Sequence, residues 1–203
     1  MKKILCVAFA AFGFLFTSQA QEVEFGAKGG LNLFNRYGDN VGNTDFRTSF
    51  HVGGVAEIKF TEKFSLQPEL LFSSQGSKYD LILDGFPEIN APVGTKATLT
   101  EKLNYINLHV IAKYYVTKGL SLEAGPQLGF LASAKRDLEF SGDTMDFDVD
   151  DEYDSFDFGL NFGLGYKLDN GLFFNGRYNL GLTNITDNNV RNEGFQFSVG
   201  FMF

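Results

Sequence analysis

One feature limits the fold of this chain more than any other: large apolar side chains alternate with polar or small ones in eight stretches. In the last stretch, FQFSVGFMF at 195–203, every second residue from Phe195 to Phe203 is large and apolar. A period of two is typical of a β-strand whose two faces meet different surroundings. The other seven stretches cover residues 23–34, 50–60, 64–72, 106–116, 120–130, 156–166 and 172–180. Each is about as long as a tilted strand that crosses a membrane.

The connections between these stretches alternate in length. Three are short, at 61–63, 117–119 and 167–171, and the last of these contains the turn-forming pair Asn170-Gly171. Four are long, at 35–49, 73–105, 131–155 and 181–194. Short turns on one rim and long loops on the other are typical of an eight-stranded antiparallel transmembrane β-barrel, with the short turns in the periplasm. Pro68 and Pro126 fall inside predicted strands, so we expect bulges or bends there.

The second face of the strands decides between a membrane barrel and a soluble carrier. A soluble lipocalin-like barrel would turn its apolar residues inward and its polar ones outward. Here the residues between the apolar ones include many ionisable groups and glycines, which suit the narrow interior of a small membrane barrel. The sequence therefore predicts that the apolar face meets lipid and the polar face lines the lumen.

Six inward charges fall at similar heights above the short-turn rim, and their signs balance. We predict that they form a paired network that plugs the lumen, since an unpaired buried charge is costly. The set is Lys28, Glu57, Glu69, Lys113, Glu123 and Arg177.

Catalysis is a weaker interpretation of the same residues. Glu57, Glu69 and Glu123 have the chemistry of general acids, and His109 that of a base. His51 and His109 are the only histidines, and no local spacing around them indicates a metal site or a Ser–His pair. We therefore expect no enzyme activity, no cofactor and no metal.

The first 20 residues have the pattern of a secretory signal peptide. Lys2 and Lys3 precede an apolar run that ends at a small-residue cleavage site, after which residues 21–203 form the mature domain. Cys6, the single cysteine, lies within the signal. Without Lys2 and Lys3, 15 of the 17 basic residues remain against 25 acidic ones, a formal charge of −10 that argues against nucleic acid as a partner.

Two of the long loops carry further signals. The acidic run around Asp146, Asp148, Asp150 and Asp151 departs twice from the pattern of a calcium loop, so we expect a solvated loop or one bridged through cations to lipopolysaccharide. The segment DFDVD within it also alternates and can extend the sheet above the membrane. The loop at 73–105 contains Leu81, Ile82 and Leu83, which form either a hairpin with the β-prone residues 95–100 or a docking site for a protein partner.

The segments LQPELLFSSQGSKY and LNYINLHVIAKYYVTKGLSLEAGPQLGFL resemble the outer membrane β-barrel domain of Bacteroidetes, the PorT-like "porin family" group. Asn107 and His109 depart from the usual pattern of that group. The resemblance implies an outer membrane location, no catalytic residues, and a role for Phe203 in the C-terminal signal that the barrel-assembly machinery reads. The apolar strand face and the acidic loop themselves predict contact with outer membrane lipid and lipopolysaccharide.

Together these observations predict a non-enzymatic outer membrane barrel with a plugged polar lumen and a structural, surface-interaction or secretion-accessory role. Three alternatives stay open: a small porin-like channel, a lipid-modifying outer membrane enzyme and a soluble ligand carrier.

Overall fold

The computed structural model describes residues 22–203 apart from 40, 43, 84–92 and 187. The predicted signal peptide, residues 1–20, lies outside the described residues. The described elements are β1 (Glu22–Gly38), β2 (Asp45–Lys59), β3 (Phe64–Gln75), β4 (Ser77–Leu83), β5 (Thr95–Tyr115), β6 (Leu120–Phe140), β7 (Asp143–Asp148), η3 (Asp150–Glu152), β8 (Phe156–Lys167), β9 (Leu172–Gly181) and β10 (Val190–Met202).

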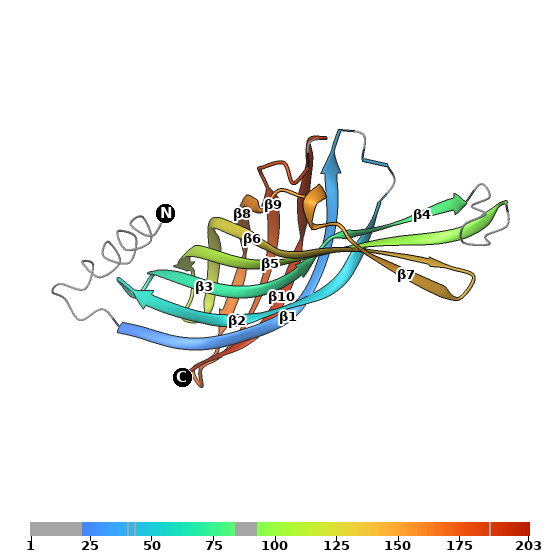
Figure 1. The fold of residues 1–203 in the computed structure, drawn as a ribbon. Coiled ribbons are helices and arrows are strands. Elements are labelled where there is room, and N and C mark those ends of the chain that lie inside the picture. Colours follow the sequence, from blue (N-terminus) through green and yellow to red (C-terminus); the bar gives the residue numbers. More distant parts are fainter. Residues whose placement is uncertain (1–21, 40, 43, 84–92, 187) are drawn as a thin grey trace.

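Eight of these strands close into a ring in the order β1-β2-β3-β5-β6-β8-β9-β10, with every neighbouring pair antiparallel (Figure 1). The ring closes where β10 pairs with β1, from Gly26–Met202 to Gly38–Val190. The stagger of the ring is found by stepping from each residue to its partner on the next strand. Such a path leaves β1 at Asn32, passes once around the ring and returns to β1 at Glu22, so the stagger is ten residues. A stagger of this kind tilts the strands by roughly 35–45° from the barrel axis. The predicted eight-stranded antiparallel barrel is confirmed.

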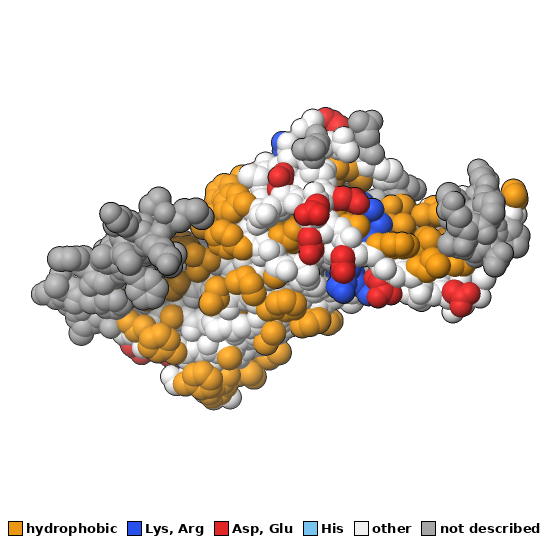
Figure 2. Space-filling view, viewed as in Figure 1, with side chains coloured by type: hydrophobic (Ala, Val, Ile, Leu, Met, Phe, Trp, Pro, Cys, Tyr) orange, Lys and Arg blue, Asp and Glu red, His pale blue; other side chains and the backbone are white. Residues whose placement is uncertain are grey.

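The two faces of the wall point as predicted. Leu70 and Phe197 lie on the outer surface with 59% and 52% of their area exposed, whereas Glu69 and Gln196, their chain neighbours, are buried inside. On β8 the exposed aromatic rings of Phe156 and Tyr166 lie ten residues apart. At the tilt of such a barrel this separation is about 25 Å, the height of a lipid-facing band between aromatic girdles. Figure 2 shows apolar side chains spread over the barrel wall.

A second structural feature is an extension of the sheet beyond the ring, in which β4, the outer part of β5, the outer part of β6 and β7 lie side by side (Figure 1). β5 and β6 each contain 21 residues, about twice the number that a membrane crossing needs. The predicted hairpin of the second long loop is confirmed by the pairing of β4 with β5, and the predicted extension of the acidic loop by β7.

The loop boundaries predicted at 73–105 and 131–155 were therefore wrong in large part, because much of both segments is strand. The outer halves of β5 and β6 pair with each other and with β4 and β7, so their backbone groups are satisfied without a membrane around them.

The prolines interrupt pairing without creating bulges. Next to Pro68 the β2–β3 pairing passes from Val55–Glu69 to Ile58–Leu66 in an unchanged register, and β3 pairs with β5 continuously through Pro68. A proline lacks one backbone donor, so it weakens the ladder on one side only. The register shift in the wall lies instead between Asn104 and Tyr105, where β5 leaves the barrel for the extension.

The lipid-facing assignment of Leu70, near mid-height of the wall, predicts the effect of a charge there. Leu70→Arg is expected to lower the free energy of unfolding by about 2–4 kcal/mol, because the guanidinium would face hydrocarbon. The measurement is urea unfolding in lipid vesicles. Ile82→Arg, at an exposed apolar position of the extension, is the matched control and is expected to change little; equal losses in both variants would contradict the assignment.

Candidate functional site

The six predicted charges come from six strands and all lie buried inside the barrel: Lys28 on β1, Glu57 on β2, Glu69 on β3, Lys113 on β5, Glu123 on β6 and Arg177 on β9. The structure brings them together in one connected set of ion pairs. They reach the same region because their strands place them at similar distances from the short-turn rim, on the inward side of the pleat.

Arg177 is the centre of this set, which we call the lumen charge network. Its Nη1 and Nη2 donate to the two oxygens of Glu69 at 2.9 and 2.8 Å, and its Nε donates to Glu123 at 2.6 Å. Lys28 Nζ lies 2.7 Å from Glu69 Oε2. The planar guanidinium thus holds two carboxylates from β3 and β6, the two neighbours of β5, which a lysine could not do with the same fixed geometry.

Lys113 connects the lower part of the network. Its Nζ lies 3.7 Å from both Glu57 and Glu123 and donates to Gln67 Oε1 at 2.9 Å. Gln67 in turn donates to Glu69 at 2.7 Å, so this neutral amide links Lys113 to the carboxylate that Arg177 binds.

Sequence reasoning missed several further partners of the network, both neutral and charged. Ser65 and Tyr115 donate to Glu57 Oε1 at 2.6 and 2.5 Å, and Lys167 lies 3.3 Å from its other oxygen. The inward parity of Ser65 and Gln67 on β3 was visible in the sequence. Their pairing with particular charges depends on the barrel stagger, which local patterns do not specify.

A second buried group has the hydrogen-bond order of a catalytic triad. Ser198 Oγ and His51 Nε2 are 2.7 Å apart, and His51 Nδ1 and Asn32 Oδ1 are 2.7 Å apart. A hydroxyl, an imidazole and an orienting amide in this order can activate a nucleophile. No local sequence pattern indicates this group, because its members lie on β10, β2 and β1.

The surroundings of this group favour a structural role. Ser198, His51 and Asn32 are all buried on the inward side of the wall. The amide of Asn32 also donates to Ser73 Oγ, to the Ser74 carbonyl and to the Phe50 carbonyl, so it ties three strands together. A reacting ester would need a donor-lined space next to Ser198, and neither the cavity at the short-turn end nor the one along the sheet extension is lined by Ser198.

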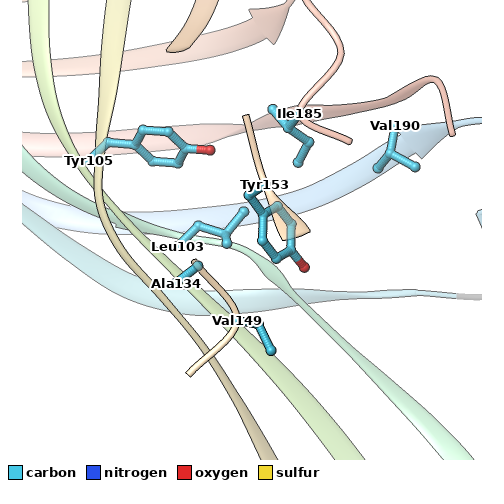
Figure 3. Close-up of a cluster of buried hydrophobic side chains, with 7 residues drawn as sticks. All are labelled: Leu103, Tyr105, Ala134, Val149, Tyr153, Ile185 and Val190. Atoms are coloured by element: carbon cyan, nitrogen blue, oxygen red, sulfur yellow. The ribbon is translucent and has the colours of Figure 1, made fainter. Parts of the chain in front are cut away.

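An apolar cluster occupies the barrel end opposite the short turns (Figure 3). Its side chains come from β5, β6, the η3 region and the segment that leads into β10: Leu103, Tyr105, Ala134, Val149, Tyr153, Ile185 and Val190. We call it the outer cap. Backbone bonds hold its loops in place, since Asp154 donates to the Ile185 carbonyl at 3.0 Å and Val149 donates to the Ala134 carbonyl at 3.0 Å.

Ion pairs join the outer cap to the sheet extension. Arg136 on β6 binds Glu101 at 3.3 Å and Glu152 at 2.9 Å, and Arg36 also binds Glu101. Burial in the outer cap is the main cause that raises the pKa of Tyr153 above its usual range, and the nearby Glu101 carboxylate adds to it, so the hydroxyl stays neutral.

The short-turn end is more open. A cavity of about 780 Å³ lies there, and its walls include Glu24, Lys59, Tyr115 and Lys167. Lys59 and Lys167 both bind Glu24, so the charged groups at this mouth neutralise one another.

The Asp side chains in the acidic run of the third long loop do not gather around one point. Asp146 and Asp148 lie on β7, Asp150 accepts from the Ala134 backbone, and Asp148 binds Lys135 at 3.3 Å. Among the described residues, no group of three or more His, Cys, Asp or Glu side chains is placed to hold a metal ion. At the other end of the chain, Phe203 donates its N–H to the Phe25 carbonyl at 2.8 Å and its ring is exposed.

Comparisons with known proteins agree with this architecture. A family model described as "Outer membrane protein beta-barrel domain" matches residues 18–187. The crystal structure of Ail, the attachment invasion locus protein of Yersinia pestis, matches with a TM-score of 0.51 over 90% of this chain and 99% of that chain, at 12% identity. Neisserial surface protein A (NspA) matches with a TM-score of 0.48 over 91% and 100% of the two chains, at 11% identity. The likeness to Ail concerns the fold. No curated protein matches the sequence.

The lumen charge network predicts strong coupling between its members. Arg177→Met is expected to lower the free energy of unfolding by about 3–5 kcal/mol, because Glu69 and Glu123 would lose their main buried cation. Glu69→Gln in the same chain should recover part of this loss. The measurement is urea unfolding in vesicles for both single variants and the double variant, with Lys118→Met, at an exposed pair, as control. Additive losses would contradict the network.

The burial of Ser198 predicts that it is unreactive. A fluorophosphonate probe is expected to leave the folded protein unlabelled, because the hydroxyl lies inside the wall. Ser198→Ala provides the blank for mass spectrometry of the labelled peptides. Stoichiometric labelling of Ser198 would show that a nucleophile is accessible there and would revive the enzyme alternative.

Proposed function

This chain belongs to the outer membrane protein beta-barrel domain family, and we propose that it is a closed, non-enzymatic barrel that displays an interaction surface outside the cell. In this proposal the lumen carries no solute, and the barrel anchors the sheet extension in the membrane. The family and the fold imply an outer membrane location. The predicted signal peptide at residues 1–20 would deliver the chain across the inner membrane.

The observation that carries the proposal is the lumen charge network. Arg177 and Glu69 are almost completely buried, and their charged atoms are used up by bonds to each other and to Lys28 and Glu123. An ion that entered the lumen would have to break several of these contacts at once. The outer cap provides a second, apolar barrier in series at the opposite end. An eight-stranded barrel is only wide enough for side chains to fill it.

Two further features support a role at the surface. β4, the outer parts of β5 and β6, and β7 project away from the wall as a sheet. The resemblance to the PorT-like group of Bacteroidetes agrees with a structural or secretion-accessory role. We expect lipopolysaccharide and lipid around the wall, and the assembly machinery to recognise the C-terminal strand that ends at Phe203.

Conductance separates this proposal from the small-channel alternative. The full-length protein in a planar bilayer is expected to give no steady current, because the two barriers lie in series. Arg177→Met with Glu69→Gln removes a central contact of the lower barrier, and Tyr153→Ala weakens the upper one. Each is expected to remain closed alone, and the combination is expected to open more often. A steady ohmic current from the unmodified protein would overturn the closed-barrel proposal.

A further inference from the structure

The inner wall carries four amide side chains whose oxygens find no hydrogen-bond partner in the described part of the chain. They are Asn161 on β8, Asn179 on β9, and Asn192 and Gln196 on β10. Each is at most 1% exposed. A buried amide oxygen without a donor costs free energy, so four of them in one region indicate that another molecule donates to them. We call this set the amide layer.

The pairing of the strands places the four side chains side by side. Asn161 pairs directly with Asn179 across β8 and β9. Across β9 and β10, Asn179 pairs with Gly194, which has no side chain and separates Asn192 from Gln196 on the same face. Directly opposite side chains in such a sheet lie roughly 5 Å apart at Cβ, and diagonal ones roughly 7–8 Å apart. The four unpartnered oxygens therefore belong to one small region of the lumen.

The amide layer lies between the two barriers of the lumen. Arg177 of the lumen charge network stands directly opposite Gln196 and two residues from Asn179 along β9. On the other side of the layer, the amide of Asn192 donates to the hydroxyl of Tyr105, a member of the outer cap, at 3.5 Å. The layer thus occupies the middle of the lumen.

Neighbouring groups fix which end of an amide is left without a partner. Asn192 donates its NH2 group at 3.0 Å to the carboxylate of Asp157, and an ionised carboxylate can only accept. Gln196 donates to Asn32 Oδ1 at 3.1 Å, because the NH2 group of Asn32 already donates to Ser73 and to two backbone carbonyls. Turning either amide round would place an oxygen against an oxygen, so the oxygens stay on the unpartnered side.

The unpartnered groups determine what can bind in the layer. The oxygens need donors, and both ends of the Asn179 amide are unpartnered, so its NH2 group needs an acceptor as well. A metal cation cannot accept from an NH2 group, and the nearby guanidinium of Arg177 would repel it. The Asp157 carboxylate already accepts from Asn192 and Thr183, one bond to each oxygen. Water both donates and accepts, and a buried water typically makes about three hydrogen bonds to such groups.

We propose that the amide layer binds a cluster of ordered water molecules, which fills the lumen between the lumen charge network and the outer cap. Water bridges polar groups that are too far apart to bond one another, and such bridges are nearly as favourable as direct hydrogen bonds. The interior then has three successive layers, of paired charges, bound water and apolar side chains. This inference extends the closed-barrel proposal to the middle of the lumen, and it rests on that proposal only for the slow escape of the water.

The test combines a high-resolution crystal structure of the full-length protein with deuteron magnetic relaxation dispersion, which detects long-lived bound water. Water density is expected within hydrogen-bond distance of at least two of the four amides, together with long-lived water in the dispersion. Asn179→Leu is expected to lose part of this density and to lower the midpoint of urea unfolding, because the remaining amides lose a bridged partner. The matched control is Asn175→Leu, at a buried asparagine on the same face of β9 on the other side of Arg177, which should leave the density in the amide layer unchanged.

Three outcomes would overturn the inference. An amide layer without water density in the unmodified protein would show a dry interior. A higher urea midpoint for Asn179→Leu would show the same, because removing an unpaired buried amide removes its desolvation cost. An anomalous-scattering peak in the layer after a rubidium soak would show a monovalent cation in place of water. Water density without long-lived water in the dispersion, together with a steady current, would refute only the closed lumen and leave the water site in place.

Discussion

Closure of the backbone hydrogen-bond ring is the constraint on which the rest of this structure depends. A strand in hydrocarbon has no water to satisfy its donors and acceptors, so every membrane-embedded strand needs a partner on both sides. The pairing of β10 with β1 provides the last of these contacts. Once the ring is closed with a stagger of ten residues, its radius and tilt are fixed, and side chains can fill its interior. The outward face must then be apolar, and the polar groups of the inward face must find their hydrogen-bond and ion-pair partners among one another.

The buried polar groups of the interior share their hydrogen-bond and ion-pair partners. Glu69 accepts from Arg177, Lys28 and Gln67, and Glu57 accepts from Ser65 and Tyr115. Such sharing offsets the large desolvation cost of buried charges only while all members stay in place. In an interior filled with polar side chains that share partners, a hydrogen bond such as the one between Ser198 and His51 is expected without any catalytic role. The same contact in an open cleft would suggest chemistry, which shows why burial has to be weighed together with geometry.

The sequence predicted the wall well, because alternation and loop length are local signals. The period of two in the sequence predicts that Leu70 and Phe197 face outward and that the six charges face inward. Turn chemistry predicts the short turns. The contacts among those charges depend on the stagger between strands, so the bridging role of Gln67 and the Asn32–His51–Ser198 group were not predictable. The strand lengths were underestimated for a similar reason: outside the membrane, β5 and β6 persist because they pair with β4 and β7. The register shift at Asn104 and Tyr105, rather than at a proline, belongs to that same transition.

The continuity of β5 and β6 has a mechanical consequence. Each runs as one strand from a short turn to the tip of the extension, and they pair with each other along most of that length. A pull at the tip therefore acts along the strand axes, and it loads many hydrogen bonds at once instead of peeling them one by one. A hinged loop would yield to such a force, whereas this sheet passes the tension into the barrel wall. The part in the barrel wall and the projecting arm are therefore formed by the same two strands.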